Sequence, residues 1–411
     1  MKKPVCRFCK TELQHTFADL GMSPFSNSYV QPRHYNCAEA YYPLHTYVCH
    51  SCFLVQLEEF KSPDQIFSDY AYFSSYSRSW LEHCKKYVDM MIERFHFNEN
   101  SFVTEIASND GYLLQYFVER GIPVLGVEPA ANVAEVAINK GIRTVVEFFS
   151  RVTARSLVVN FSHKADLILG NNVLAHVPDI NDFVAGLKIF LTDNGVITFE
   201  FPHLLQLIQH SQFDTIYHEH FSYLSLLSVE KIFTAQGLEL FDVEQLTTHG
   251  GSIRIFAQHA GGPQALQQRL IDLRQAETDA GLDRLETYTS FAQKIVKIKS
   301  DLLEFMIRQQ RDGKKVVGYG APAKGNTLLN YCGIGPEYLP FTVDLSPHKQ
   351  GTLLPGSRIP VFAPEKITEA RPDYVLILPW NLREEIMAQM AHVKTWGGRF
   401  VVPIPQLEII G

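Results

Sequence analysis

The 411-residue chain contains no run of about 20 apolar residues, which is the length a helix needs to cross a bilayer. It has no dense stretch of lysine and arginine, and its net charge of −7 argues against a protein that binds nucleic acid by neutralising phosphates. No apolar signal segment follows the first residues, and repeats and low-complexity segments are absent. These absences predict a soluble, cytoplasmic, multidomain protein that binds neither nucleic acid nor a membrane, and we expect a monomer.

Four of the seven cysteines form two Cys-x-x-Cys pairs, Cys6 with Cys9 and Cys49 with Cys52. Zn²⁺ binds four thiolates tetrahedrally, and each short pair can supply two of them from one tight turn. The alternatives are weaker, because redox pairs favour a helix start after a strand and disulfides need an oxidising compartment. We therefore predict one structural zinc site that staples a small zinc-binding domain over residues 1–70.

Short β-rich segments alternate with helical segments from Val103 to about residue 260. Strands are expected at 103–107, 124–127, 144–146, 166–169, 195–201, 238–243 and 253–256. This rhythm is typical of an α/β fold with a doubly wound parallel sheet. Because no helix separates the last two strands, one of them should be antiparallel. One or two long helices are predicted over 266–311, and a second Rossmann-like α/β unit should follow Gly313.

The turn after the first strand, residues 105–111, reads Glu-Ile-Ala-Ser-Asn-Asp-Gly. Ligands of open α/β sheets bind beyond the carboxyl ends of the strands, and this turn lacks the G-x-G-x-x-G pattern of dinucleotide sites. Glu128, at the end of the second strand, is placed to accept hydrogen bonds from a ribose, which suits S-adenosylmethionine. A plain turn beside a solvated glutamate is the alternative. The predicted cofactor-binding residues are Glu105, Ala107, Ser108, Asn109, Gly111, Glu128, Pro129, Asn171 and Asn172.

The run Tyr217-His218-Glu219-His220 follows the fifth strand and gathers four polar side chains. Its spacing is not that of an H-E-x-x-H zinc site. His220 can serve as a general base, with Glu219 or Tyr217 orienting it or stabilising charge. A lone histidine here would be structural, but a cluster at the mouth of the sheet favours catalysis.

Two further residues are candidates for the same site, and each has a plainer alternative. His176 follows the fourth strand and either faces the crevice or caps the next helix. Tyr76 ends the aromatic run 70–76 and either packs in the core or reaches the substrate with its hydroxyl.

A third motif, Gly318 to Asn326, reads Gly-Tyr-Gly-Ala-Pro-Ala-Lys-Gly-Asn and predicts a strand, a turn and a helix. Backbone amides at a helix N-terminus bind phosphate, and Lys324 adds a positive charge. The spacing is not that of a Walker motif, and a glycine-rich turn without a ligand is the alternative. The predicted substrate-binding residues are Tyr319, Gly320, Lys324, Asn326 and, from the turn-rich segment 346–351, Lys349.

The cysteine pairs and the motifs at 105–111, 217–223, 248–254 and 318–326, taken in this order, resemble the zinc-containing, S-adenosylmethionine-dependent sugar C-methyltransferases. The resemblance covers essentially the whole chain. It implies three domains: a zinc-binding head at 1–70, a central seven-stranded methyltransferase domain at 71–262, and a long helix with a Rossmann-like domain at 263–411. The last of these would help to hold a nucleotide diphosphate.

The same resemblance implies methylation at C-3′ of a nucleotide-diphosphate-linked 4-keto-6-deoxysugar in branched deoxysugar biosynthesis. His220 would be the base, with Tyr76, Tyr217, Glu219 and His176 around the sugar. The chemistry agrees, because a proton beside a ketone is acidic enough for a positioned histidine to remove. Two other hypotheses stay open: an O- or N-methyltransferase of another small molecule, and a non-enzymatic binding protein with degenerate nucleotide folds.

Overall fold

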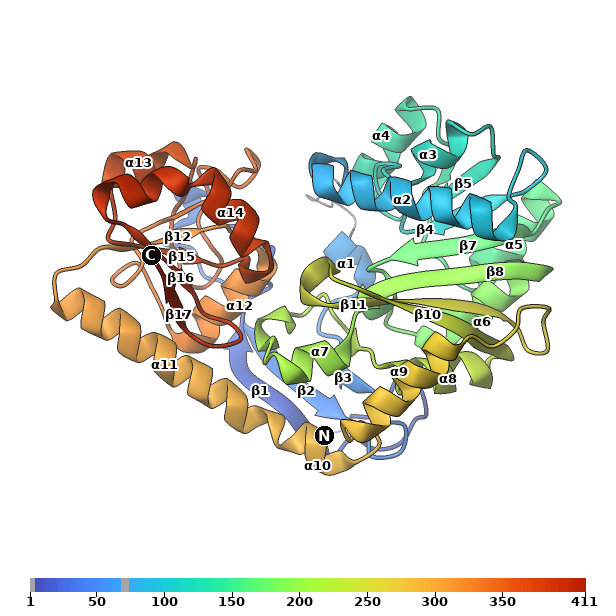
Figure 1. Ribbon diagram of the computed structural model, residues 1–411, viewed down its shortest axis with the longest axis horizontal. Helices are drawn as coiled ribbons and strands as arrows, with labels where there is room; N and C mark the ends of the chain where they lie inside the picture. Colours follow the sequence, from blue (N-terminus) through green and yellow to red (C-terminus); the bar gives the residue numbers. More distant parts are fainter. Residues whose placement is uncertain (1–3, 68–73) are drawn as a thin grey trace. The chain divides into compact units, whose positions relative to one another are not determined.

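A computed structural model describes residues 4–67 and 74–411 (Figure 1). The chain divides into two compact units, and each unit combines segments that are distant in sequence. Unit 1 comprises Met1–Leu13, Cys49–His203 and Phe221–Asp283, and unit 2 comprises Gln14–Val48, Leu204–His220 and Arg284–Gly411. The three-part division at residues 70 and 262 stays a prediction.

Unit 1 is built on a seven-stranded sheet of order β10-β11-β8-β7-β4-β5-β6. Its strands are β4 (Val103–Ile106), β5 (Val124–Val127), β6 (Thr144–Val145), β7 (Ala165–Asn171), β8 (Leu191–Pro202), β10 (Leu238–Leu246) and β11 (Ser252–His259). β11 runs antiparallel to both β8 and β10, whereas the strands from β8 to β6 pair in parallel. The predicted α/β fold, its seven strands and the antiparallel strand near its end are confirmed.

Helices cover both faces of this sheet, as the alternation along β8 shows. Val196 packs in the core beneath α2 (Arg78–Phe95) and α3 (Leu114–Val118). Phe199 points the other way, where its ring lies 5.7 Å from that of Phe183 in α6 (Ile180–Phe190). The other elements of unit 1 are β3 (Val55–Leu57), β9 (Ser222–Tyr223), α1 (Pro63–Phe67), α4 (Ala131–Asn139), α5 (Arg151–Phe161), α8 (Leu226–Ala235), α9 (Gln268–Asp279) and the 3₁₀ turns η2 (Ser74–Tyr76), η3 (Leu174–His176) and η5 (Thr248–Gly250).

Unit 2 contains a six-stranded sheet of order β14-β13-β12-β15-β16-β17. Its strands are β12 (Val316–Tyr319), β13 (Thr342–Val343), β14 (Val361–Phe362), β15 (Tyr374–Ile377), β16 (Arg399–Val402) and β17 (Glu408–Ile410), of which only β17 pairs antiparallel within this sheet. The helical elements are α7 (Leu204–Gln209), α10 (Leu285–Thr289), α11 (Phe291–Arg311), α12 (Ala323–Cys332), α13 (Glu365–Ala370), α14 (Arg383–Gln389), η1 (Pro32–His34), η4 (Phe213–Thr215), η6 (Trp380–Leu382) and η7 (Ala391–Trp396).

Two of the elements that the sequence did not predict are the strand β1 in unit 2 and the helix α2 in unit 1. The segment after Leu13, expected to be irregular, forms the nine-residue strand β1 (His15–Ser23), which pairs antiparallel with β2 (Tyr42–Val48) in unit 2. Irregular register at two points of β1 disrupts its alternation of buried and exposed residues, and this hides the strand from a period-2 search. In unit 1, α2 begins at Ser77, whose hydroxyl accepts the Trp80 N–H at 3.3 Å.

Within the part of the chain that the structure describes, every helix is too short or too polar to span a bilayer.

Candidate active site and metal centre

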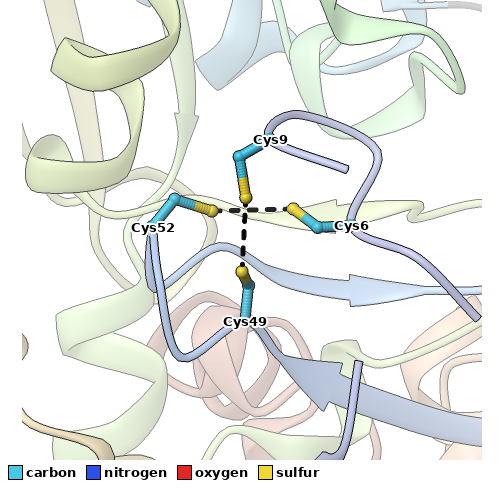
Figure 2. A group of neighbouring side chains, drawn as sticks. All are labelled: Cys6, Cys9, Cys49 and Cys52. Atoms are coloured by element: carbon cyan, nitrogen blue, oxygen red, sulfur yellow. Dashed lines mark hydrogen bonds between the residues drawn. The ribbon is translucent and has the colours of Figure 1, made fainter. Parts of the chain in front are cut away.

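The two cysteine pairs of unit 1 meet at one point. Their four Sγ atoms lie within 4.8 Å of one another, with Cys6 to Cys52 at 3.6 Å and Cys9 to Cys49 at 3.5 Å. Figure 2 shows the side chains converging from two turns. A tetrahedral Zn²⁺ with bonds of about 2.3 Å would place the sulfurs about 3.8 Å apart. The donor set therefore fits a four-thiolate zinc site, and the four cysteines are positioned for a metal.

The two turns that carry the cysteines are built alike. The N–H of Lys10 donates to the carbonyl of Cys6 at 3.0 Å, and the N–H of Phe53 donates to that of Cys49 at 2.8 Å. Both Lys10 and Phe53, each directly after the second cysteine of its pair, have positive φ angles of 64° and 63°. Gln56 donates its amide N–H to Cys6 Sγ at 3.2 Å, the kind of outer contact that orients a metal-bound thiolate.

The predicted cofactor residues gather in unit 1 at the carboxyl ends of β4, β5 and β7. In the loop after β4, Ala107, Asn109 and Gly111 have positive φ angles of 57°, 50° and 76°. Glu128 accepts the N–H of Asn109 at 2.9 Å and that of Ala130 at 2.8 Å. Pro129 has no N–H, so Ala130 supplies the next donor. Glu128 thus holds the loop in shape, and burial raises its pKa.

Three buried acceptor atoms at the end of β4 have no hydrogen-bond partner among the described residues. Both carboxylate oxygens of Glu105 and the hydroxyl of Ser108 are buried without a hydrogen bond. Burial raises the pKa of Glu105 well above its usual range, although the neighbouring Tyr112 hydroxyl opposes this shift. Orphaned acceptors of this kind fit a ligand rich in donors, such as the ammonium and ribose hydroxyls of S-adenosylmethionine.

Asn171 and Asn172 lie at the carboxyl end of β7, on the other side of β4 from β5. Asn171 donates its amide N–H to the Tyr112 hydroxyl at 3.3 Å, and Asn172 Nδ2 lies 3.0 Å from His249 Nε2. His176 ends η3, directly beyond, and is half-buried.

Tyr76 lies in η2, which is hydrogen-bonded to the loop after β4. Ser74 donates its N–H to Asn109 Oδ1 at 3.0 Å, and the Ser75 hydroxyl donates to Asp110. Tyr76 itself is 69% exposed, so its ring is presented to solvent. Tyr70, Tyr72 and Phe73 of the aromatic run lie outside the described residues.

The run from Tyr217 to His220 belongs to unit 2. His220 Nδ1 lies 2.9 Å from the carbonyl oxygen of Thr215, and the ring of Tyr217 packs on the His220 ring with centroids 4.0 Å apart. Asn27 donates its amide N–H to Glu219 Oε1 at 3.2 Å. His218 turns inward instead, is 2% exposed and packs 4.8 Å from the Phe25 ring.

The predicted substrate residues also lie in unit 2, around the start of α12. Lys324 donates to Asn381 Oδ1 at 2.9 Å and lies 4.4 Å from the Trp380 ring centroid. Lys349 donates to the Ala321 carbonyl at 2.9 Å. Gly320 has a φ angle of 91°, and an added Cβ would lie 2.4 Å from Pro379. The turn therefore requires glycine at this position.

Tyr319 and Asn326 are buried and have protein partners. The Tyr319 hydroxyl donates to Gln389 at 3.1 Å, and burial raises its pKa to about 12. Asn326 donates to the Ser26 carbonyl at 2.6 Å, and Thr327 donates to that of Ile216 at 3.0 Å. Segments 26–29, 214–220 and 319–327 thus form one cluster in unit 2.

Three family models match the chain. They are described as "Putative zinc binding domain" at residues 6–67, "Methyltransferase domain" at 80–243 and "C-methyltransferase C-terminal domain" at 247–405. The C-methyltransferase NovU of Streptomyces niveus is 35% identical over 405 residues, which cover 98% of this chain and 96% of the relative. This chain belongs to the C-methyltransferase family. It is an S-adenosylmethionine-dependent C-methyltransferase with a methyltransferase fold and a zinc-binding domain.

Two other proteins are similar to shorter parts of this chain. A ubiquinone biosynthesis O-methyltransferase of Bartonella quintana (strain Toulouse) is 29% identical over 99 residues, which cover 24% of this chain and 40% of the relative. The crystal structure of an S-adenosylmethionine-dependent methyltransferase from Clostridium acetobutylicum ATCC 824 aligns at 12% identity and a TM-score of 0.35, covering 44% of this chain and 92% of its own. Neither adds to the assignment.

The C-methyltransferase also contains a polar cluster in unit 1 that sequence reasoning missed. Glu200 of β8 is fully buried, lies 2.8 Å from His83 Nε2, and accepts hydrogen bonds from Arg254 at 2.6 Å and Thr248 at 2.8 Å. Burial raises its pKa, but the contacts with His83 and Arg254 outweigh this and lower it to about 2. Glu200 and Arg254 are direct cross-strand partners, a relation that depends on sheet register and that no local motif reveals.

Proposed function

We propose that this enzyme transfers the methyl group of S-adenosylmethionine to C-3′ of a nucleotide-diphosphate-linked 4-keto-6-deoxysugar. The predicted cofactor residues belong to unit 1, and the predicted base and nucleotide-binding residues belong to unit 2. The proposal is supported by the C-methyltransferase family, by the similarity to the C-methyltransferase NovU, and above all by the tautomer of His220.

The carbonyl oxygen of Thr215 can only accept a hydrogen bond, so His220 Nδ1 must carry the proton of that 2.9 Å contact. In the neutral ring, Nε2 then keeps the lone pair and is the nitrogen that accepts a proton. A histidine held in one tautomer by a backbone carbonyl is suited to general-base catalysis. The Tyr217 ring, packed on the imidazole, further restricts its orientation.

His220 would remove the proton from C-3′, beside the C-4′ ketone, and the electrons of the broken C–H bond would form an enolate. Hydroxyl and imidazole donors from Tyr217, Tyr76 and His176 are proposed to stabilise the enolate oxygen. S-adenosylmethionine, when bound, offers an electrophilic methyl group on a sulfonium. C-3′ would then form its new bond to that carbon as the sulfur–methyl bond breaks, which leaves S-adenosylhomocysteine and a protonated His220.

Zinc has no part in this step. Cys6, Cys9, Cys49 and Cys52 would hold it in the head of unit 1, with no ligand position left for a substrate. Its proposed contribution is to the folding of the segments around the two turns.

The deciding experiment is a mass-spectrometric assay with S-adenosylmethionine and a panel of dTDP-, GDP- and CDP-linked 4-keto-6-deoxysugars. A product one methylene heavier is expected with one carrier, and NMR should place the methyl group on carbon. In D₂O without S-adenosylmethionine, the C-3′ proton should exchange with solvent in the wild type and not in His220→Asn. A methyl group on oxygen or nitrogen, or exchange that persists in the variant, would overturn the enolate route.

A further inference from the structure

In unit 1, an acid directly after the second strand fixes the loop that follows the first strand. Glu128 follows β5 and accepts the N–H of Asn109, in the loop after β4, at 2.9 Å. It also accepts the N–H of Ala130, two residues further along its own segment, at 2.8 Å. The sequence points to Glu128 as a ribose acceptor, because carboxylates at this place in doubly wound sheets bind ribose hydroxyls.

The same arrangement recurs in unit 2 at a residue that no motif indicated. Asp344 follows β13 and accepts the N–H of Ala321, in the turn after β12, at 2.7 Å. It accepts the N–H of Ser346, two residues further along, at 2.8 Å. β13 pairs in parallel with β12 as β5 pairs with β4, so Asp344 occupies in its sheet the position that Glu128 occupies in the other.

Asp344 retains capacity for another donor. Each of its oxygens has one backbone N–H partner, and a carboxylate oxygen can accept a second hydrogen bond. Its side chain is 15% exposed, so a ligand can reach it. Lys349 Nζ lies 3.7 Å from Asp344 Oδ2 and is 27% exposed, which places a cation where the charge of the acid would otherwise repel a diphosphate.

We propose that Asp344 accepts a hydrogen bond from a sugar hydroxyl of the nucleoside in the nucleotide-linked substrate. This inference rests on the proposed function and deepens it, because it identifies a residue that selects the nucleoside through its pentose. Asp344 holds the 2′- or 3′-hydroxyl, while the turn at Gly320 and the start of α12 face the diphosphate.

The test is calorimetry of the protein with dTDP, GDP and CDP, followed by analogues of the nucleotide that binds: the 3′-deoxy analogue in each case and, for GDP or CDP, also the 2′-deoxy analogue. Loss of the recognised hydroxyl should weaken wild-type binding about tenfold or more, the usual effect of a hydrogen bond to a charged group. Asp344→Asn should bind the parent nucleotide more weakly and discriminate much less against the analogue. If removal of the hydroxyl weakens binding equally in the wild type and in Asp344→Asn, Asp344 only shapes the turn.

Asp373→Asn is the matched control. Asp373 also accepts a backbone N–H, that of Lys315 at 2.8 Å, but it lies at the amino ends of β12 and β15. Its variant should discriminate between the nucleotide and its analogue as the wild type does. Should Asp344→Asn fail to fold, the wild type alone still decides, because equal affinity for the nucleotide and both analogues would overturn the inference. If no nucleoside diphosphate binds the wild type, the proposed function fails with it.

Discussion

Glu128 in unit 1 and Asp344 in unit 2 make the same backbone hydrogen bonds, but the connection between the neighbouring strand and helix differs. Seven residues, 107–113, separate β4 from the five-residue α3 in unit 1, whereas three residues, 320–322, separate β12 from the ten-residue α12 in unit 2. A tight turn places the amides of the helix N-terminus next to the strand end, where they stabilise a bound phosphate most strongly. A long loop before a short helix leaves room for a ligand without phosphates. The difference therefore matches a nucleotide in unit 2 and S-adenosylmethionine in unit 1.

The units also differ in how they hold a buried acid. In unit 1, two partners hold Glu200 charged, and its pKa falls to about 2. In unit 2, burial raises the pKa of Asp214 to about 6, although Lys324 and a 2.7 Å hydrogen bond from the Trp380 N–H oppose the shift. The partners of Glu200 thus compensate fully for the burial of its charge, whereas those of Asp214 compensate only in part.

Metal removal should have the largest effect on folding, and this effect should be confined to unit 1. A double variant, Cys6→Ser with Cys49→Ser, should lose one zinc per chain and amide protection around both turns. The six-stranded sheet of unit 2 should keep its protection. Zinc binding contributes on the order of 10 kcal/mol to the folding of thiolate sites, so the two cysteine turns of unit 1 should unfold. Metal analysis and hydrogen exchange measure this, with the exposed Cys37→Ser as control. Full zinc content in the double variant would contradict the site.

His220→Asn should separate the roles of the units. Methyl transfer should fall by about 10²- to 10⁴-fold, the usual contribution of a general base. The affinity for S-adenosylmethionine, measured by calorimetry, should change little because the predicted cofactor residues lie in unit 1, whereas His220 lies in unit 2. His218→Asn is the neighbouring comparison, and should lower thermal stability more than turnover because its ring is buried. Joint loss of activity and cofactor binding in His220→Asn would indicate a structural role.

Glu200→Gln tests how much the charge of Glu200 contributes to stability. Because its folded-state pKa is depressed from 4.5 to about 2, Glu200 contributes stability above pH 4.5 that disappears as the pH falls through 2. The variant should lose about 3 kcal/mol of unfolding free energy at pH 7. Urea unfolding from pH 2 to pH 7 measures the gap between the two proteins, which should widen with pH. A constant gap would show that the charge of Glu200 is not the cause.

Asp214→Asn tests a pKa shift in the opposite direction, because the pKa of Asp214 is raised whereas that of Glu200 is lowered. An acid with a raised pKa makes the folded state bind protons more tightly, so stability should fall as the pH rises from 3.8 to about 6 and then level off. This decline, of about 2–3 kcal/mol, should be missing from the variant. The same urea series at pH 4, 5, 6 and 7 measures it, with Asp312→Asn, at an exposed position on the surface of unit 2, as control. An identical pH profile in wild type and variant would refute the shift.

Local patterns predicted what depends on local sequence. Apolar runs such as Leu167 to Leu169 gave the strands, and the spacing within each cysteine pair gave the metal centre. The helix α2 could also have been found, because Cys84, Tyr87, Val88 and Met91 follow a helical period and are buried.

Other features depend on contacts that no local window contains. Glu200 meets Arg254 through the register of β8 and β11, and Asp344 meets Ala321 across two strands. The turn-rich segment 346–351 pointed to Lys349, but Asp344 itself lies outside that segment and outside every motif. Such sites become visible only when the two sheets are compared.

The division of the chain between the units sets the order in which they can be completed during synthesis. All of unit 1 has been made once Asp283 leaves the ribosome. The first residues of unit 2, from Gln14, are made long before Asp283, but Ser26 meets its partner Asn326 only 300 residues later, and Tyr29 meets Ala321 after 292. Contacts of such long range slow folding. The segment 14–48 is therefore made well before the residues of unit 2 that it contacts, and it cannot complete those contacts until residues 321–326 have been made.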